Sequence, residues 1–268
     1  MMKIKKVSKS FGGVKALDKC SISIKKNDIT AIIGPNGCGK STLFNVINKL
    51  EIQDEGKIFL DKKDISSAKP YEVARKGVSR TFQYPTLFEN LTIRDHIEMA
   101  LMQDDEYVIK SLFGRNENKN REQNRKQDGE QNREKNKEQD ERQDYDKKIK
   151  SVLELVGLKK DSSTLGSNLS YGQRKLLDLA IAIAKPHELI LLDEPVAGIN
   201  PGLREEIKKI IRLLIKKGET IVLIEHDMNF VMELADEIFV MDEGKVLVSG
   251  SPNNIRNNPK VLEAYLGD

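Results

Sequence analysis

The stretch GPNGCGKST, Gly34 to Thr42, decides the fold of this chain. Its first eight residues fit the pattern G-x-x-x-x-G-K-[ST] in full, and an apolar run precedes them. Glycines at these positions let backbone N–H groups turn toward a phosphate, and the helix expected from about Ser41 directs its positive N-terminal end at the same anion. The pattern places Lys40 at the β- and γ-phosphates and the Ser41 hydroxyl on Mg²⁺. The predicted nucleotide contacts are Gly34, Pro35, Asn36, Gly37, Cys38, Gly39, Lys40, Ser41 and Thr42.

Composition excludes several classes of function. The chain has 268 residues, of which 45 are Lys or Arg and 42 are Asp or Glu, so its formal net charge is +3. This balance lacks the basic excess typical of nucleic-acid binding. The two cysteines, Cys20 and Cys38, are too few for a disulfide framework and indicate a reducing compartment. Because Cys38 lies near a predicted helix N-terminus, we expect a lowered thiol pKa and alkylation that ATP blocks.

The sequence also predicts where the chain works. No stretch reaches the ~18 consecutive apolar residues of a transmembrane helix, and the N-terminal residues MMKIKKVSKSF lack a signal-peptide apolar run. We therefore expect a protein that neither spans a membrane nor is secreted. Any work at a membrane would need another chain as its anchor.

Apolar runs alternate with helical patterns along the chain, which predicts an α/β fold with a mostly parallel sheet. The runs ELILLDEP and TIVLIEHD resemble buried parallel strands, and the segment between them has one apolar helical face. The segment 237–250 predicts a hairpin that turns at Asp242 to Gly244, and so an antiparallel edge. Further strands are expected in 3–13, 20–34 and 56–61, and further helices in 41–50, 171–184 and from Lys147 onward.

The segment 115–144 differs from the rest because it contains no hydrophobic residue. Asn or Asp recurs there every fourth position, and both signs of charge are interspersed. Such a segment cannot bury enough apolar surface to offset the entropy lost on ordering. A protein- or RNA-binding arm is one interpretation, but the pattern favours a solvated loop that grew by repeat expansion.

An acidic pair follows the strand LILLD. Asp193 is placed to hold the Mg²⁺ shell, and Glu194 could polarise an attacking water as general base. The alternative is a pair of acidic residues that merely cap the next helix. A complete phosphate loop in the same chain favours the catalytic interpretation.

The stretch NLSYGQRKLLDLAIAIA, 168–184, predicts a capped helix with Ser170 as its N-cap. The simple interpretation is a core helix. The more specific one is a second phosphate-binding helix end, at which Gly172 exposes its backbone N–H.

The order of these motifs resembles that of the ABC transporter ATPases over nearly the whole chain. The resemblance identifies LSYGQ as the signature, so Ser170, Gly172 and Gln173 are expected to contact nucleotide. It implies that Gln83 touches Mg²⁺, that the switch histidine His226 contacts the γ-phosphate, and that Phe11 stacks on adenine. The metal contacts it implies are Ser41, Gln83 and Asp193, and the catalytic residues are Glu194 and His226. His96 and His187 match no motif and are expected to be structural.

The resemblance also implies a partner for the site. In ABC ATPases two domains dock head to tail, so that the phosphate loop of one and the signature of the other enclose the same ATP. Two positions depart from the commonest pattern, since Tyr171 stands where many members have glycine and Asn200 where many have aspartate. Both residues leave hydrogen-bonding groups in place, so we expect an active site.

Several strings resemble the ATP-binding subunit of branched-chain amino acid importers: RTFQYPTLFENLTI, EPVAGINP, IEHDM and the C-terminal GSPNNIRNNPKVLEAYLG. That family implies permease subunits, a second ATPase subunit, an extracytoplasmic solute-binding protein acting indirectly, and a place on the inner face of the cell membrane. It also implies one ATPase domain, with a catalytic core in 1–83 and 186–250, a helical subdomain in about 84–185 and a helical tail in 251–268. Urea or amide importer and lipopolysaccharide-export ATPases remain alternatives.

Hypotheses from other classes are less well supported. Ribosome-type ABC proteins carry two ATPase halves in one chain, whereas this sequence has one. DNA-repair members carry a long coiled coil between the two motif sets. The segment 115–144 cannot form a coiled coil, because it lacks apolar heptads. A regulatory module that binds ATP without hydrolysing it has only Tyr171 and Asn200 in its favour.

Overall fold

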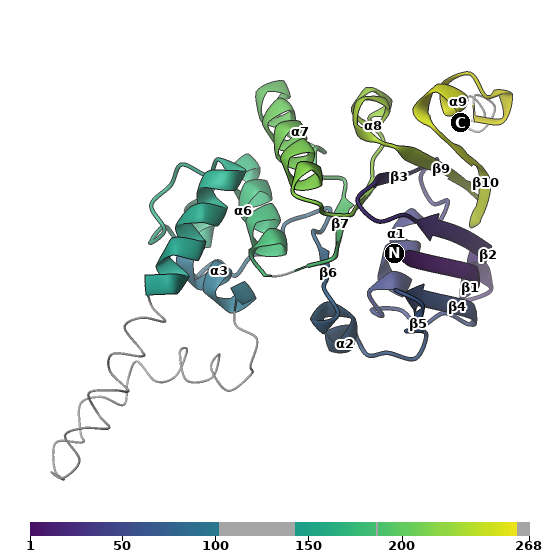
Figure 1. The fold of residues 1–268 in the computed structure, drawn as a ribbon, viewed down its shortest axis with the longest axis horizontal. Coiled ribbons are helices and arrows are strands. Elements are labelled where there is room, and N and C mark those ends of the chain that lie inside the picture. Colours follow the sequence, from purple (N-terminus) through teal and green to yellow (C-terminus); the bar gives the residue numbers. More distant parts are fainter. Residues whose placement is uncertain (102–142, 186, 262–268) are drawn as a thin grey trace, which may run out of the picture. The chain divides into compact units, whose positions relative to one another are not determined.

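The computed structural model describes residues 1–101, 143–185 and 187–261. The chain forms two compact units, one built from 1–85 together with 186–268 and the other from 86–185. Figure 1 gives the order of the elements along the chain. Within the described ranges, no helix combines the length and apolar character needed to cross a bilayer.

A six-stranded sheet in the order β10-β9-β3-β8-β7-β6 forms the centre of the first unit. Its pairs β3–β8, β3–β9, β7–β8 and β6–β7 are parallel, and only β9–β10 is antiparallel. Every residue of β3, β7 and β8 is buried, as expected for strands covered on both faces. The strands are β3 (Ile29–Ile33), β6 (Val78–Arg80), β7 (Leu189–Asp193), β8 (Ile221–Ile224), β9 (Glu237–Asp242) and β10 (Lys245–Gly250).

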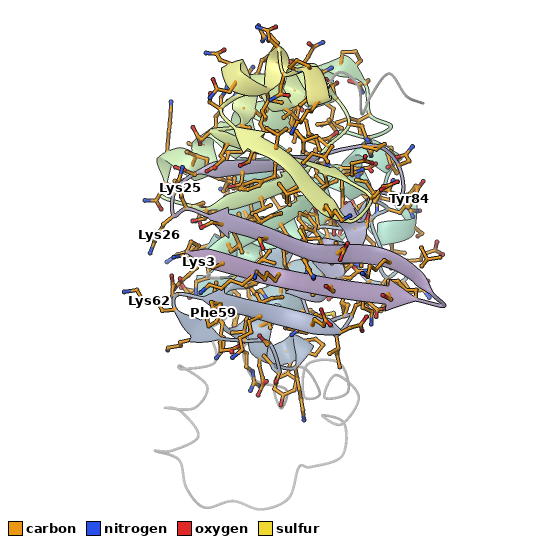
Figure 2. The ribbon with its side chains drawn as sticks, turned by 90° about the vertical axis from the view of Figure 1, so that its right-hand side faces the viewer. Lys3, Lys25, Lys26, Phe59, Lys62 and Tyr84 are labelled. Carbon is orange, nitrogen blue, oxygen red and sulfur yellow. The ribbon has the colours of Figure 1, made fainter. Side chains whose placement is uncertain are left out.

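A second, antiparallel sheet in the order β2-β1-β4-β5 belongs to the same unit. Buried and exposed residues alternate at the start of β1, because Met2 and Ile4 face the core while Lys3 faces outward. Lys3 lies opposite Phe59 of β4, and both are labelled in Figure 2. The strands are β1 (Met2–Phe11), β2 (Val14–Ile24), β4 (Glu55–Leu60) and β5 (Lys63–Asp64).

The core of this unit surrounds helix α1 (Lys40–Ile47), which follows the phosphate loop. Leu43, Phe44 and Ile47 are fully buried on this helix and share one apolar cluster with residues of both sheets. The start of α1 is therefore fixed by packing on both sides. The other helices of the unit are α2 (Pro70–Arg75), α7 (Pro201–Lys216), α8 (Met228–Leu234) and α9 (Pro252–Arg256).

The second unit is helical in its described part. It contains α3 (Ile93–Leu101), a helix through 143–156, the short 3-10 helix η2 (Gly166–Asn168) and α6 (Tyr171–Ala184). His96 on α3 is buried, accepts a hydrogen bond from the Phe88 N–H at 3.0 Å and lies 2.7 Å from the Thr92 carbonyl through Nδ1. It therefore holds the chain that leads into α3, which agrees with the structural role expected for it.

The predicted fold class is confirmed, with three differences in detail. The stretch 20–34 is not one strand but contains the end of β2, a turn and the whole of β3. The N-terminal strands form a sheet of their own, which the apolar pattern did not separate from the central one. The helix expected from Lys147 already includes 143–146, and the rest of the segment 115–144 lies outside the described residues. The hairpin turn at Asp242 to Gly244 is confirmed.

Candidate nucleotide-binding and catalytic site

The candidate site lies where the parallel strands end. Ile32 pairs with Ile224, and Asp193 pairs with the same Ile224, so β3, β8 and β7 terminate side by side. The phosphate loop follows β3, the acidic pair ends β7, and His226 follows β8. Ligands of open α/β sheets bind at this carboxyl edge. Pairing of the strands thus brings together motifs that are nearly 200 residues apart, as the numbers 34 and 226 show.

The phosphate loop is shaped by two glycines that approach other backbone segments closely. A Cβ atom on Gly34 would lie 2.1 Å from the Met241 carbonyl oxygen, and one on Gly39 would lie 2.2 Å from the Ala16 carbonyl oxygen. Both glycines also have a positive φ, a backbone conformation that is unfavourable for residues with a Cβ atom. Any other residue at either place would displace the loop.

Lys40 closes this loop. Its Nζ donates to the Gly34 and Pro35 carbonyl oxygens, at 2.8 Å each, and the side chain is buried. The helix N-cap residue Gly39 provides no side-chain hydrogen bond to the first turn of α1, whose N–H groups carry a partial positive charge. Ammonium and helix end together make an anion site, and Ser41, in that first turn, is exposed.

Asp193 is buried and forms an ion pair with Arg80 of β6, with Nη2 of the guanidinium 2.8 Å from Oδ2. Arg80 also donates to the Asn45 side chain at 2.8 Å, and the rings of Phe44 and Phe82 lie 5.4 and 4.9 Å from its guanidinium carbon. A buried charge needs such compensation. The Arg80 guanidinium therefore compensates the burial of the Asp193 carboxylate at the strand end.

Glu194 lies at the centre of a three-residue contact. Gln83 Nε2 donates to one of its carboxylate oxygens at 2.8 Å, and His226 Nε2 lies 2.8 Å from the other. Both contacts are within hydrogen-bonding distance. The candidate general base, the candidate metal-contacting glutamine and the candidate switch histidine thus meet at one point.

The backbone at Glu194 is in the left-handed region, with φ of 45°. A side-chain-bearing residue in this region costs of the order of 1–3 kcal/mol and persists only where the surroundings enforce it. Here the Glu194 N–H donates to the Ile224 carbonyl at 3.0 Å and its own carbonyl accepts from the Ala197 N–H at 3.2 Å. Strain of this kind is typical of functional positions.

Phe11 ends β1 with its side chain 44% exposed, so its ring face is accessible for stacking. Lys9 Nζ lies 5.0 Å from the ring centroid, which gives the exposed ring a cationic neighbour.

Ser170, Gly172 and Gln173 lie in the other unit, at the start of α6. Ser170 is the N-cap, as predicted, and its hydroxyl accepts from the Gln173 N–H at 3.4 Å. The Gln173 side chain accepts from the Ser170 N–H at 3.0 Å, so the two residues form a capping box. Tyr171 follows as the first helical residue, with its side chain 39% exposed.

Asn200, which stands where many family members have aspartate, has a local structural role. It is the N-cap of α7, and its side-chain oxygen accepts from the Leu203 N–H at 3.0 Å. Aspartate and asparagine are about equally good at this position. The missing charge therefore leaves the helix start intact.

The residues at the strand ends fit Mg²⁺. The Ser41 hydroxyl, the Asp193 carboxylate and the Gln83 amide supply only oxygen ligands, which this hard cation requires. In the described part of the chain, no three acidic, histidine or cysteine side chains converge as a ready-made metal site. Mg²⁺ does not need one, because it shares its shell with waters and substrate phosphates.

Comparisons with known proteins agree with this geometry. The family model for ABC transporters matches residues 17–197, which include the phosphate loop, the signature and the acidic pair. A probable branched-chain amino acid transport ATP-binding protein LivG of Archaeoglobus fulgidus is 34% identical over 267 residues and covers 100% of this chain and 95% of its own length. The chain belongs to the LivG family of ABC transporter ATP-binding proteins.

Other matches place this ABC ATPase in the same group. The model for the branched-chain amino acid ATP-binding cassette transporter matches residues 245–268. LivG of Salmonella typhimurium is 33% identical, with 96% of this chain and 94% of the relative covered. A nucleotide-free ATP-binding cassette from an ABC transporter superposes with a TM-score of 0.79 at 32% identity, covering 100% and 99% of the two chains. The ADP conformation of such a cassette gives a TM-score of 0.77 at 30% identity, covering 100% and 99%.

The expected lowering of the Cys38 thiol pKa in this ABC ATPase is wrong. The thiol is buried, and burial raises its pKa despite the opposing effect of the nearby Lys40 ammonium. The helix N-terminus alone therefore does not make a thiolate here. Burial likewise raises the pKa of Cys20 to about 12.

We expect Cys38 to resist alkylation. At pH 7 a raised pKa reduces the thiolate fraction, and burial blocks access, so iodoacetamide should modify the native protein far more slowly than the denatured protein. Mass spectrometry of timed samples would measure both rates, with the Cys20→Ala variant isolating the Cys38 signal. Fast labelling of Cys38 in the native protein would contradict the raised pKa.

Sequence reasoning missed two residues of the site. Arg80 could have been noticed as a charged residue three positions before Gln83. Glu225, which is buried next to His226, could have been noticed as an acid in the apolar run TIVLIEHD. In both cases the sequence shows a charged residue in an unusual place but does not show which residue it contacts.

Proposed function

We propose that this chain is the ATP-hydrolysing subunit of an importer for branched-chain amino acids. The observation that carries the proposal is the contact of Glu194 with Gln83 and His226 at the end of β7, next to the phosphate loop. The group of relatives named for branched-chain amino acid transport supports the substrate class.

The residues have separate tasks toward ATP. Lys40 and the N–H groups at the start of α1 would bind the β- and γ-phosphates, and Phe11 would stack on the base. Ser41, Gln83 and Asp193 would hold Mg²⁺, which neutralises phosphate charge when bound. Arg80 would orient the Asp193 carboxylate for this task through their ion pair.

The contacts of Glu194 suggest how hydrolysis depends on the bound nucleotide. Both carboxylate oxygens accept hydrogen bonds from side chains that have a second task at the nucleotide. When His226 turns to the γ-phosphate and Gln83 to the metal shell, the carboxylate is released to accept a proton from the attacking water. In this proposal, both oxygens of the general base are occupied by Gln83 and His226 until nucleotide binds.

The signature residues act on a neighbour in this proposal. Ser170, Gly172 and Gln173 would complete the site of a second ATPase subunit, and transmembrane permease subunits would receive the motion at the inner face of the membrane. A solute-binding protein would act indirectly through the permeases. We also propose that the ATPase domain is divided as the sequence predicts. The catalytic core comprises 1–83 and 186–250, the helical subdomain about 84–185, and the C-terminal helical tail 251–268.

Reconstitution with branched-chain amino acid permease subunits from the same organism tests the proposal. Proteoliposomes that contain the complex and a leucine-loaded binding protein should hydrolyse ATP several-fold faster than those without leucine, and should accumulate labelled leucine. Urea, amides and lipopolysaccharide serve as competing substrates in parallel samples. Stimulation by one of these in place of leucine would contradict the substrate class, and ATP hydrolysis without any import would contradict the transport role.

A further inference from the structure

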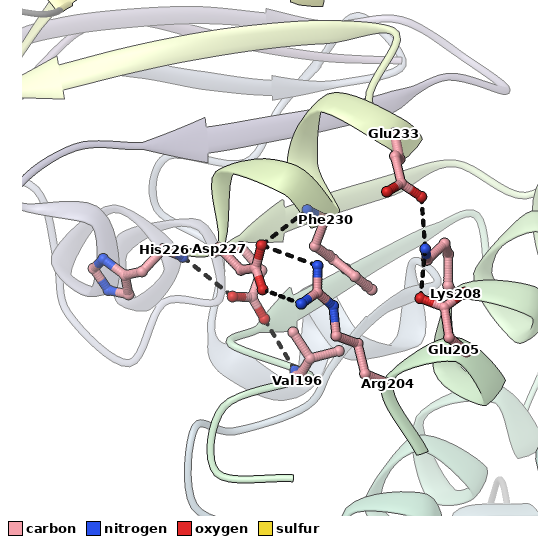
Figure 3. Close-up of polar contacts among 9 residues, drawn as sticks. Val196, Arg204, Glu205, Lys208, His226, Asp227, Phe230 and Glu233 are labelled. Atoms are coloured by element: carbon pink, nitrogen blue, oxygen red, sulfur yellow. Dashed lines mark hydrogen bonds and ion pairs between the residues drawn. The ribbon is translucent and has the colours of Figure 1, made fainter. Parts of the chain in front are cut away.

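Glu225 is a buried carboxylate that holds two loops of the site. Its side chain lies between them with only 3% of its surface exposed. One oxygen accepts from the Val196 N–H at 3.0 Å, and the other accepts from the His226 N–H at 3.1 Å. Figure 3 shows these bonds reaching Val196 on one side and His226 on the other.

The two backbone groups that Glu225 binds belong to the segments carrying the catalytic pair. Val196 stands two residues after Glu194, within the turn whose backbone is strained at φ of 45°. His226 donates its own backbone N–H, while its ring lies 2.8 Å from Glu194. The same carboxylate therefore fixes the chain on both sides of the Glu194–His226 contact.

Asp227, the residue after His226, anchors the loop that carries His226 to helix α7. Asp227 pairs with Arg204 of α7 through both carboxylate oxygens, at 3.1 and 2.7 Å, and caps α8 by accepting from the Phe230 N–H at 3.0 Å. Figure 3 shows this second connection beside the first. His226 thus lies between two anchored neighbours, so its backbone is held while its partly exposed ring can turn.

We propose that Glu225 is a positioning residue for ATP hydrolysis, which fixes the Glu194 turn and the His226 loop in one arrangement through its backbone hydrogen bonds. Glutamate suits this position because a carboxylate offers two acceptor oxygens, one for the Val196 N–H and one for the His226 N–H. Glutamine would turn an NH₂ group toward at least one of them. The burial that raises the Glu225 pKa is opposed by the same N–H groups, which favour the charged form.

This inference rests on the proposed hydrolysis, and its test uses the full chain in its transporter complex. The Glu225→Gln variant should lose about 10- to 100-fold in kcat, because small misplacements of catalytic groups cost this much. Its KM and its Kd for ATP should stay within about twofold of wild type, since the phosphate loop is untouched. A purely structural role would lower the melting temperature without this split between kcat and KM.

A matched control distinguishes positioning from loss of stability. Asp236 accepts the Ile29 N–H at 2.8 Å at the opposite end of β3, so Asp236→Asn removes a similar carboxylate–backbone bond away from the site. It should keep wild-type kcat at temperatures below its own unfolding. If Asp236→Asn loses as much kcat as Glu225→Gln, or if Glu225→Gln keeps kcat within twofold, the inference is wrong.

A double variant tests whether Glu225 acts through Glu194. If Glu225 acts through Glu194, adding Glu225→Gln to Glu194→Gln should lower the residual kcat by less than about twofold, whereas independent effects would multiply. Multiplication would overturn the inference. A wild-type complex without ATP hydrolysis would instead overturn the proposed function, so the two failures can be told apart.

Discussion

Replacing Glu194 with glutamine will lower the rate of ATP hydrolysis by about 10²- to 10⁴-fold, the range that a positioned general base contributes. The amide has nearly the same shape but cannot take a proton from water. The amide keeps one acceptor oxygen for Gln83 or His226 and turns an NH₂ group toward the other. The strained turn should remain folded, because the Glu194 N–H still donates to the Ile224 carbonyl. ATP affinity should stay near that of wild type or increase, and ATP should remain bound where the wild type releases ADP. Release of labelled phosphate and filter retention of labelled ATP measure the two effects.

The matched control for this variant lies at the opposite end of β7. Glu188 is an exposed glutamate immediately before β7, whereas Glu194 follows its end. Glu188→Gln makes the same chemical change at the other end of the strand and should leave hydrolysis unchanged. Near-native hydrolysis by Glu194→Gln would show that another group accepts the proton, and would remove Glu194 from its proposed role.

The parts of this site that could be predicted from the sequence are those whose chemistry is contained in one short segment. The phosphate loop has its glycines, lysine and serine within eight positions, and the Ser170 cap precedes its own helix. Buried strands are equally local, because their apolar runs need no partner to be recognised. For these features the periodicity of the side chains and the preferred backbone angles of glycine are sufficient.

The parts that could not be predicted depend on contacts between distant segments. The sequence predicts Asp193 as a site residue, but its ion pair with Arg80 becomes visible only when β6 pairs with β7 and buries both side chains. Glu225 looks like any acid at a strand end until the Val196 N–H reaches it. The raised pKa of Cys38 has the same origin, since the helix end can be read from the sequence but the burial of the thiol cannot.

Replacing Lys40 with alanine should remove most ATP binding. Hydrogen bonds from a charged group contribute about 1.5–3 kcal/mol, so the Kd for ATP should rise by roughly 10- to 150-fold, at about 1.4 kcal/mol per factor of ten. In the free protein the Lys40 ammonium already bonds the Gly34 and Pro35 carbonyls, so its loss also loosens the loop. Both effects act in the same direction. Titration with a fluorescent ATP analogue would measure the Kd directly.

Thermal unfolding separates loss of affinity from loss of stability. A ligand at 100 times its Kd stabilises the folded state by about 2.7 kcal/mol, so ATP and Mg²⁺ should raise the melting temperature of the wild type by several degrees. The control is Lys49→Ala, which removes a buried ammonium just beyond the other end of α1, where Nζ bonds only the Gln53 side chain among the described residues. Lys49→Ala should unfold at a lower temperature yet keep the ATP-induced rise, whereas Lys40→Ala should lose that rise. If Lys40→Ala keeps it, the phosphates are bound mainly by the backbone of the loop and the end of α1.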